Sequence, residues 1–355
     1  DEPSEFVTQS FTGDGTVSSL SRGKKYLTAA AKVEKDGKTG FASRRIPLEN
    51  ADVRMTRRIL QQSYYLAATK VLGTVPPWGA LSGVRPTKLS TKCMLEGGSE
   101  KDAARLLEKT YFVTPERSRL CVDASKHTLE AAKLLEPGDL SVYIGIPFCP
   151  TRCSYCSFVS RTVGDKATRA LVQPYVDKLC AELTAIRETA DRCGLHIRTF
   201  YIGGGTPTSL SAAQLEQLMS HIAKTFDLAK LDEYTVEAGR PDCTDAEKLR
   251  IIKKYGATRI SINPQTFSDQ VLQNIGRRHT AQDIIDCFAA ARAAGHKNIN
   301  MDLIAGLPGD SVEGFEASLR QAIALDPENI TVHTLTLKRA SNIVVEHRAA
   351  DYADV

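Results

Sequence analysis

The stretch SVYIGIPFCPTRCSYCSF, residues 141–158, decides the fold. It begins with an apolar run, 141–146, that is typical of a buried strand. Three cysteines then fall within eight residues, Cys149, Cys153 and Cys156. Thiolates at the spacing Cys-x3-Cys-x2-Cys can bind one side of a cubane cluster and leave one iron without a protein ligand. Structural zinc normally closes its shell with four ligands. The spacing favours an iron–sulfur cluster over a zinc site completed by a distant histidine, or over three unrelated buried cysteines.

Five more apolar runs follow this one, separated by helical patterns. We predict strands at 141–146, 198–203, 233–238, 258–263, 298–304 and 329–335. Alternation of strands and helices implies parallel strands joined by right-handed crossovers, and strands that are apolar throughout imply burial on both faces. A doubly wound sheet and a barrel both satisfy this pattern. In either fold the chemistry gathers at the carboxyl ends of the strands.

Polar or glycine residues follow most of these strands. They are Gly204, Gly205 and Thr206 in GGGTPT, Glu237 in VEAGRPD, Gln265 in SINPQTF and Asp302 in NMDLIAGLPGD. Because the carboxyl ends of parallel strands share one edge, we expect these groups to converge near the cysteines. Any one of them alone could be a helix cap or a satisfied buried residue. Arg277, Arg278 and His279 are ordinary surface candidates, and His333 in the last strand is expected to be a core or lining residue.

The first part of the chain has a different, α+β pattern. Two strands around Asp36-Gly37 are typical of a hairpin, and helices are predicted over 51–72, 100–109 and 115–135. Residues 75–89, with Trp78, Arg85 and Lys88, are predicted to be a structured loop. The basic run RMTRR, 54–58, is interpreted as a solvated helix face. We place a domain boundary at EPGD, 136–139, which divides the chain into 1–138 and 139–340. Residues 341–355 are expected to begin a further region of a longer protein.

Composition narrows the class of protein. The 355 residues include 46 Lys and Arg against 42 Asp and Glu, a net charge of +4, and 42% are hydrophobic. These values exclude disordered, collagen-like and coiled-coil chains and give no indication of nucleic-acid binding. Without an apolar stretch long enough for a membrane span or a signal peptide, we expect a cytoplasmic protein. Nine cysteines, an odd number, argue against a disulfide framework.

Together these motifs carry a family resemblance. The series Y-x-G-I-P-F-C-P-T-x-C-x-Y-C, GGGTPT, VEAGRPD, SINPQTF, IGRRHT and DLIAGLPGD resembles the radical S-adenosylmethionine (SAM) superfamily. Within it, the chain is similar to the oxygen-independent coproporphyrinogen III dehydrogenase family and most of all to its HemZ-like branch, to which W-G-x-L-S-G-V-R-P-T-K also corresponds. The resemblance spans about 75–337.

The resemblance implies a partial (β/α)6 TIM-like barrel that holds a [4Fe-4S] cluster on Cys149, Cys153 and Cys156, with SAM chelating the fourth iron. Carried over position by position, the cofactor residues would be Tyr143, Tyr155, Gly204, Gly205, Thr206, Glu237, Gln265, Arg277 and Asp302. Leu335 would line the site. One electron, from a donor such as flavodoxin or ferredoxin, would cleave SAM to methionine and a radical that takes a hydrogen atom from the substrate.

The activity that the resemblance implies is conversion of coproporphyrinogen III to protoporphyrinogen IX in haem biosynthesis, by loss of CO2 and an electron from two propionates. Phe158 and Gly145 depart from the dehydrogenase pattern, which has Cys and His there. Phe158 instead resembles the HemW branch, so a haem-binding chaperone with a [4Fe-4S] cluster is the alternative. The partner would be a porphyrinogen or haem. An inert, cluster-stabilised fold agrees poorly with so many polar groups at strand ends.

Overall fold

The computed structural model describes residues 13–81, 85–338 and 340–345. The chain divides into two compact units, 1–136 and 137–355. No helix in the described ranges combines the length and the apolar character that crossing a membrane requires.

An antiparallel sheet forms one part of the first unit. Its strands are β1 (Gly15–Arg22), β2 (Tyr26–Lys35) and β3 (Lys38–Pro47), in that spatial order. Asp36 and Gly37 join β2 to β3 with positive φ angles of 49° and 74°, which is the geometry of a tight hairpin turn and confirms the predicted hairpin. The strand β1 was not predicted, because its mostly small and polar residues, GTVSSLSR, give a weak strand signal.

Helix α1 (Val53–Leu72) packs on this sheet. The Asp52 side chain caps its first turn by accepting a hydrogen bond from the Met55 backbone N–H, and Gly73 ends it in the left-handed conformation. The contact with the sheet is close at Gly40, where a Cβ atom would lie 2.2 Å from the Ala67 carbonyl oxygen. Only glycine at this position lets the helix approach the sheet so closely.

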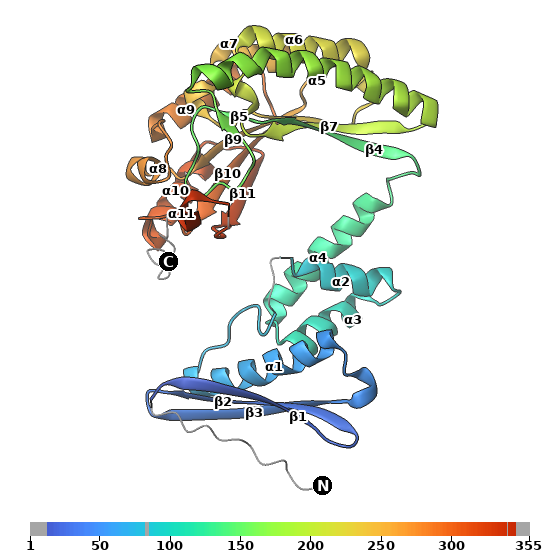
Figure 1. The fold of residues 1–355 in the computed structure, drawn as a ribbon, viewed down its shortest axis with the longest axis vertical. Helices are drawn as coiled ribbons and strands as arrows, with labels where there is room; N and C mark the ends of the chain where they lie inside the picture. The colour runs from blue at the N-terminus through green and yellow to red at the C-terminus, as the bar shows by residue number, and fades with distance from the viewer. Residues whose placement is uncertain (1–12, 82–84, 339, 346–355) are drawn as a thin grey trace. The chain divides into compact units, whose positions relative to one another are not determined.

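The rest of the first unit is helical (Figure 1). Its helices are α2 (Thr87–Leu95), α3 (Glu100–Arg105), which continues as a π-helical turn (Leu106–Thr110), and α4 (Pro115–Ala132). The predicted loop 75–89 is therefore wrong over its last three residues, which belong to α2. Pro86 did not exclude a helix there, because it immediately precedes the helix, where proline is tolerated. Part of that loop, 82–84, lies outside the described residues. The predicted helix 115–135 ends three residues early.

The second unit contains a six-stranded parallel sheet in the described part of the chain. Its strands are β4 (Asp139–Ile146), β7 (His196–Gly204), β8 (Glu233–Glu237), β9 (Arg259–Gln265), β10 (Ile299–Ala305) and β11 (Asn329–Thr334). They lie side by side in chain order. A doubly wound sheet would reverse its strand order at a switch point, so the order selects the partial barrel. The predicted strands and fold class are confirmed.

Helices cover one face of this sheet; α5, α6 and α7 lie along it in Figure 1. The helices of the unit are α5 (Lys166–Cys193), α6 (Ala212–Thr225), α7 (Ala246–Lys254), α8 (Asp269–Asn274), α9 (Ala281–Ala293), α10 (Val312–Ala324) and α11 (Asn342–Val345). The core between sheet and helices is apolar, with Ile202, Val236 and Ile262 fully buried. This core fixes the strand ends on which the site is built.

Candidate cofactor site at the strand ends

A cavity of about 540 Å³ opens at the carboxyl ends of the barrel strands. All twelve residues predicted for the cluster and the cofactor line it: Cys149, Cys153, Cys156, Tyr143, Tyr155, Gly204, Gly205, Thr206, Glu237, Gln265, Arg277 and Asp302. The lining also includes Leu335 and His333, so His333 is a lining residue, as expected. Residues from all six strands of the sheet and from the cysteine loop thus meet at one site.

Backbone hydrogen bonds attach the cysteine loop to the end of β7. A short parallel pair, β5 (Phe148–Cys149) and β6 (Arg161–Thr162), begins and closes the loop. The Gly205 N–H donates to the Ile146 carbonyl at 2.8 Å, and the Thr206 N–H donates to the Phe148 carbonyl at 2.7 Å. The Thr206 hydroxyl lies 3.6 Å from the Cys149 Sγ atom. The GGGT segment therefore positions the first cysteine directly.

This attachment explains why the segment contains consecutive glycines. A Cβ atom on Gly205 would lie 2.6 Å from the Phe148 carbonyl oxygen and 2.9 Å from the Cys149 Sγ atom. Gly204 has a φ of +105°, which side chains rarely allow. The molecule that approaches these glycines closely is thus the chain's own cysteine loop.

Arg277 is buried in the cavity wall, with 6% of its surface exposed, rather than on the surface. Its guanidinium donates to the Asn263 carbonyl at 2.7 Å and to the Tyr155 hydroxyl at 3.3 Å. Burial raises the pKa of Tyr155, so its hydroxyl is neutral. Within the described residues, the Nε atom of Arg277 has no hydrogen-bond partner. A buried cation with an unused donor can bind an anionic group of a ligand.

A second buried arginine, Arg240, was missed by the sequence analysis. Its guanidinium forms a two-point ion pair with Asp242, at 2.9 and 2.8 Å, and donates to the Thr151 hydroxyl at 2.9 Å. Its Nη1 atom also lies 3.6 Å from the Cys153 Sγ atom. With only 4% exposure, Arg240 places a fixed positive charge beside a cysteine sulfur. The only signal in the sequence was its position after the third barrel strand, in VEAGRPD.

Carboxylates gather on another side of the cavity. Glu237 accepts a 2.6 Å hydrogen bond from the Tyr201 hydroxyl, and Asp302 accepts one from the Asn300 amide at 2.7 Å. Burial raises the pKa of Glu237, and the nearby Asp302 raises it further, while Tyr201 opposes the shift. Tyr201, which was also missed, stacks on Tyr143 with ring centroids 5.7 Å apart. A ligand cation or hydroxyl would relieve this crowding of acidic groups.

Gln265 lies at an irregularity in the sheet. The register between β9 and β10 shifts before it, and its φ of 70° is left-handed, which is uncommon for a residue other than glycine. Among the described residues, its buried Oε1 atom and the Oδ1 atom of Asn263 have no hydrogen-bond partner. Because buried polar atoms are nearly always satisfied, these two point to an absent polar ligand.

The cysteines suit a cluster better than a single metal ion. In the described residues, no three His, Cys, Asp or Glu side chains are placed to hold one ion together. A cubane cluster instead takes each thiolate on a different iron. Burial raises the pKa of the Cys156 thiol, so metal binding at this position must displace a proton.

Comparison with known proteins identifies the family. Residues 143–322 match the radical SAM superfamily. The chain is also 36% identical over 350 residues to the oxygen-independent coproporphyrinogen-III oxidase-like protein HemZ of Bacillus subtilis (strain 168), a match that covers 97% of this chain and 68% of that protein. The chain belongs to the radical SAM superfamily, in its HemN/HemZ family. Members of this superfamily bind a [4Fe-4S] cluster and SAM, and the donor set described above fits both groups.

Other relatives match a shorter part of the chain. The heme chaperone HemW of Bacillus subtilis (strain 168) is 40% identical over 199 residues, 56% of this chain and 51% of that protein. The solved structure of coproporphyrinogen III oxidase (HemN) from Escherichia coli, a radical SAM enzyme, has 25% identity and a TM-score of 0.50, and the match covers 64% of this chain and 50% of that one. The chain thus spans about half the length of these two relatives.

Proposed function

We propose that this protein catalyses the oxygen-independent oxidative decarboxylation of coproporphyrinogen III to protoporphyrinogen IX in haem biosynthesis. The observation that carries the proposal is the likeness to the HemZ protein, which extends over 97% of the chain and so includes the first unit as well as the barrel. The cavity supports it with a donor set suited to radical SAM chemistry.

In this proposal each part of the cavity has a distinct role. Cys149, Cys153 and Cys156 hold the cluster, and Arg277 binds a carboxylate of SAM through its unused Nε donor. Glu237 and Asp302 accept hydrogen bonds from cofactor amino or hydroxyl groups. When bound, the two cofactors supply one-electron cleavage of a sulfonium and abstraction of a substrate hydrogen atom. We infer that a small reductant protein, such as a flavodoxin or ferredoxin, supplies the electron, and that a one-electron acceptor takes up the electron that leaves the substrate with each CO2.

The test is anaerobic turnover by the reconstituted protein. With dithionite, SAM and coproporphyrinogen III, we expect release of CO2 and about two molecules of 5'-deoxyadenosine per substrate, because each propionate needs one hydrogen abstraction. Mass analysis of the porphyrins would show successive losses of the two carboxyl groups. Coproporphyrin that is left untouched while SAM is cleaved would refute the proposed substrate.

A haem-binding chaperone is the second candidate, and Phe158 favours it. This residue follows the third cysteine, lines the cavity and is 63% exposed, so it can pack against a flat apolar ligand. The similarity to the HemW protein, over 199 residues, agrees with this interpretation. Stoichiometric haem uptake without any vinyl product would favour the chaperone. Replacing Phe158 by alanine should then weaken haem binding without changing the iron content.

A further inference from the structure

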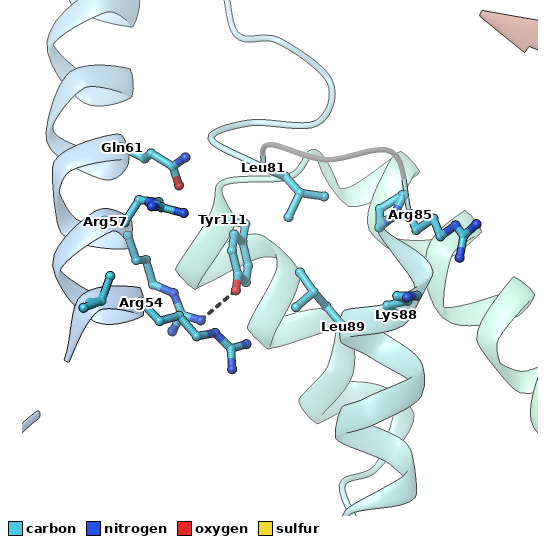
Figure 2. Close-up of a pocket in the computed structure, with 11 residues that line it drawn as sticks. Arg54, Arg57, Gln61, Leu81, Arg85, Lys88, Leu89 and Tyr111 are labelled. Atoms are coloured by element: carbon cyan, nitrogen blue, oxygen red, sulfur yellow. Dashed lines mark hydrogen bonds between the residues drawn. The ribbon is translucent and has the colours of Figure 1, made fainter. Parts of the chain in front are cut away.

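A second cavity, of about 470 Å³, lies entirely within the first unit (Figure 2). Its charged lining comes from two elements. Arg54, Arg57 and Arg58 project from α1, while Arg85 lies two residues before α2 and Lys88 lies in its first turn. The sequence analysis interpreted the run at 54–58 as a solvated helix face. Arg54 and Arg57 are indeed exposed, but they border a hollow that the second set of cations also borders.

Between the two sets of cations the cavity is lined by less polar groups. Figure 2 shows Leu81, Leu89 and Tyr111 between the arginines of α1 and the Arg85–Lys88 pair. The Arg58 guanidinium donates a 2.8 Å hydrogen bond to the Tyr111 hydroxyl and lies 5.2 Å from the Tyr111 ring centroid. Arg58 and Tyr111 therefore hold each other in place and join α1 to the helical part of the unit. The hollow has a preformed apolar floor with cations on two sides.

Among the residues that the structure describes, these cations have no carboxylate partner. The cavity lining contains no Asp or Glu, and in the described part of the chain no carboxylate forms an ion pair with any of the five cations. A carboxylate that borders the adjoining hollow, Glu96, is paired with Lys92 at 3.5 Å. Several like charges around one hollow raise the local concentration of anions. The hollow is therefore electrostatically suited to a ligand with negative charge.

We propose that this basic cavity binds a tetrapyrrole through its propionate carboxylates; this inference rests on the proposed function. An apolar floor between two cationic sides suits a ligand with an apolar body and carboxylates on more than one edge, and arginine binds carboxylate at two points. The volume is in the range of small-molecule sites. A polynucleotide would instead bind an extended basic face along a helix or groove. The net charge of +4 over 355 residues shows no large excess of basic residues.

The experiment uses the whole chain and coproporphyrin III, the air-stable oxidised form with four carboxylates, as a fluorescent probe. We expect the double variants R54Q/R57Q and R85Q/K88Q each to weaken binding about tenfold, because each removes two charge-assisted contacts. The matched control R119Q/K133Q removes two exposed cations of the same unit that do not line the cavity, and should change affinity by less than about twofold. Binding should also weaken as salt rises. Iron content and melting temperature should match the wild type in all three variants.

The outcomes separate this inference from the proposed function. If the wild type binds coproporphyrin III through these cations but produces no vinyl product from the porphyrinogen, the function fails and the site stands. If the wild type decarboxylates its substrate and both cavity variants bind and react as it does, the site is refuted while the function stands. Tighter binding of a single-stranded RNA that displaces the porphyrin from the wild type would also refute it.

Discussion

Replacing Gly205 by alanine tests how the protein holds its cysteine loop. The added Cβ atom would lie 2.6 Å from the Phe148 carbonyl oxygen, and 2.9 Å from both the Ile146 carbonyl oxygen and the Cys149 Sγ atom. Non-bonded carbon atoms have their optimal separation at about 3.5–4.0 Å, so all three of these distances lie in the repulsive range. Both carbonyls also accept the hydrogen bonds that attach the loop. Relief of the clash must therefore move the loop away from β7.

The cost follows from these contacts. Overpacking of this kind costs about 1–3 kcal/mol, and weakening one of the two loop hydrogen bonds adds about 1 kcal/mol. We expect a loss of about 3 kcal/mol, which in a domain of about 200 residues lowers Tm by about 6–12 °C. Because the shift displaces Cys149, the variant should also lose most of its iron after anaerobic reconstitution.

The assay combines thermal denaturation followed by circular dichroism with iron determination per chain. The matched control is Gly164→Ala, since a Cβ atom there would meet nothing within 4 Å and the backbone has no positive φ. This control should bind iron normally and be as stable as the wild type. If Gly205→Ala matched Gly164→Ala in both measurements, the reasoning about the loop would be wrong.

Three further predictions concern single contacts in the site. Cys153→Ala should remove most of the iron and the brown colour, whereas Cys287→Ala should not, because Cys287 lies buried in the barrel core; the reverse result would contradict the assignment. Arg240→Gln should destabilise the protein to urea by about 3 kcal/mol, because the Asp242 carboxylate, whose side chain is only 15% exposed, then keeps only His279, at 3.6 Å, as an ion-pairing neighbour among the described residues. R240Q/D242N should recover much of this loss, and an R240Q variant as stable as the wild type would contradict the prediction. Glu237→Gln should stabilise the cofactor-free protein at neutral pH while weakening SAM binding. Burial raises the pKa of Glu237 in the folded protein above its ordinary value of 4.5. Below pH 4.5 the glutamate is protonated in both the folded and the unfolded wild type and costs no stability. As the pH rises through the folded-state pKa, the buried glutamate ionises and destabilises the wild type relative to the variant. The amount by which the Tm of Glu237→Gln exceeds that of the wild type should therefore shrink as the pH falls. A constant difference between pH 5 and 8, measured with about 0.5-unit steps, would contradict the prediction.

The barrel could be predicted because its signals repeat. Each strand is apolar throughout, and each is followed by groups that one end of a parallel sheet must bring together. No single residue was decisive, since Glu237 or Asp302 alone is equally compatible with a helix cap. Their joint appearance after successive strands made convergence predictable, and the cavity contains them all.

Other features depend on packing that no local pattern encodes. The sheet irregularity at Gln265 arises between β9 and β10, which are neighbours only in the folded barrel. Arg240 is in a loop where arginine is usually exposed, and its burial depends on Asp242 and on the cysteine loop. The cavity of the first unit likewise combines helix residues with residues near 85–88, a stretch for which only a loop was predicted.

The same contacts bear on how the cluster is acquired. The cysteine loop is attached at points that involve no metal: the Ser154 N–H donates to the Ile275 carbonyl at 3.0 Å, and the Thr151 hydroxyl donates to the Gly276 carbonyl at 2.9 Å. Together with the bonds from Gly205 and Thr206, these hold the loop on both sides of Cys153. Where metal ligands are disordered before the metal binds, part of the free energy of metal binding drives the folding of the site. Here the loop is ordered by the barrel itself, so loss of the cluster should leave the barrel folded and able to take it up again.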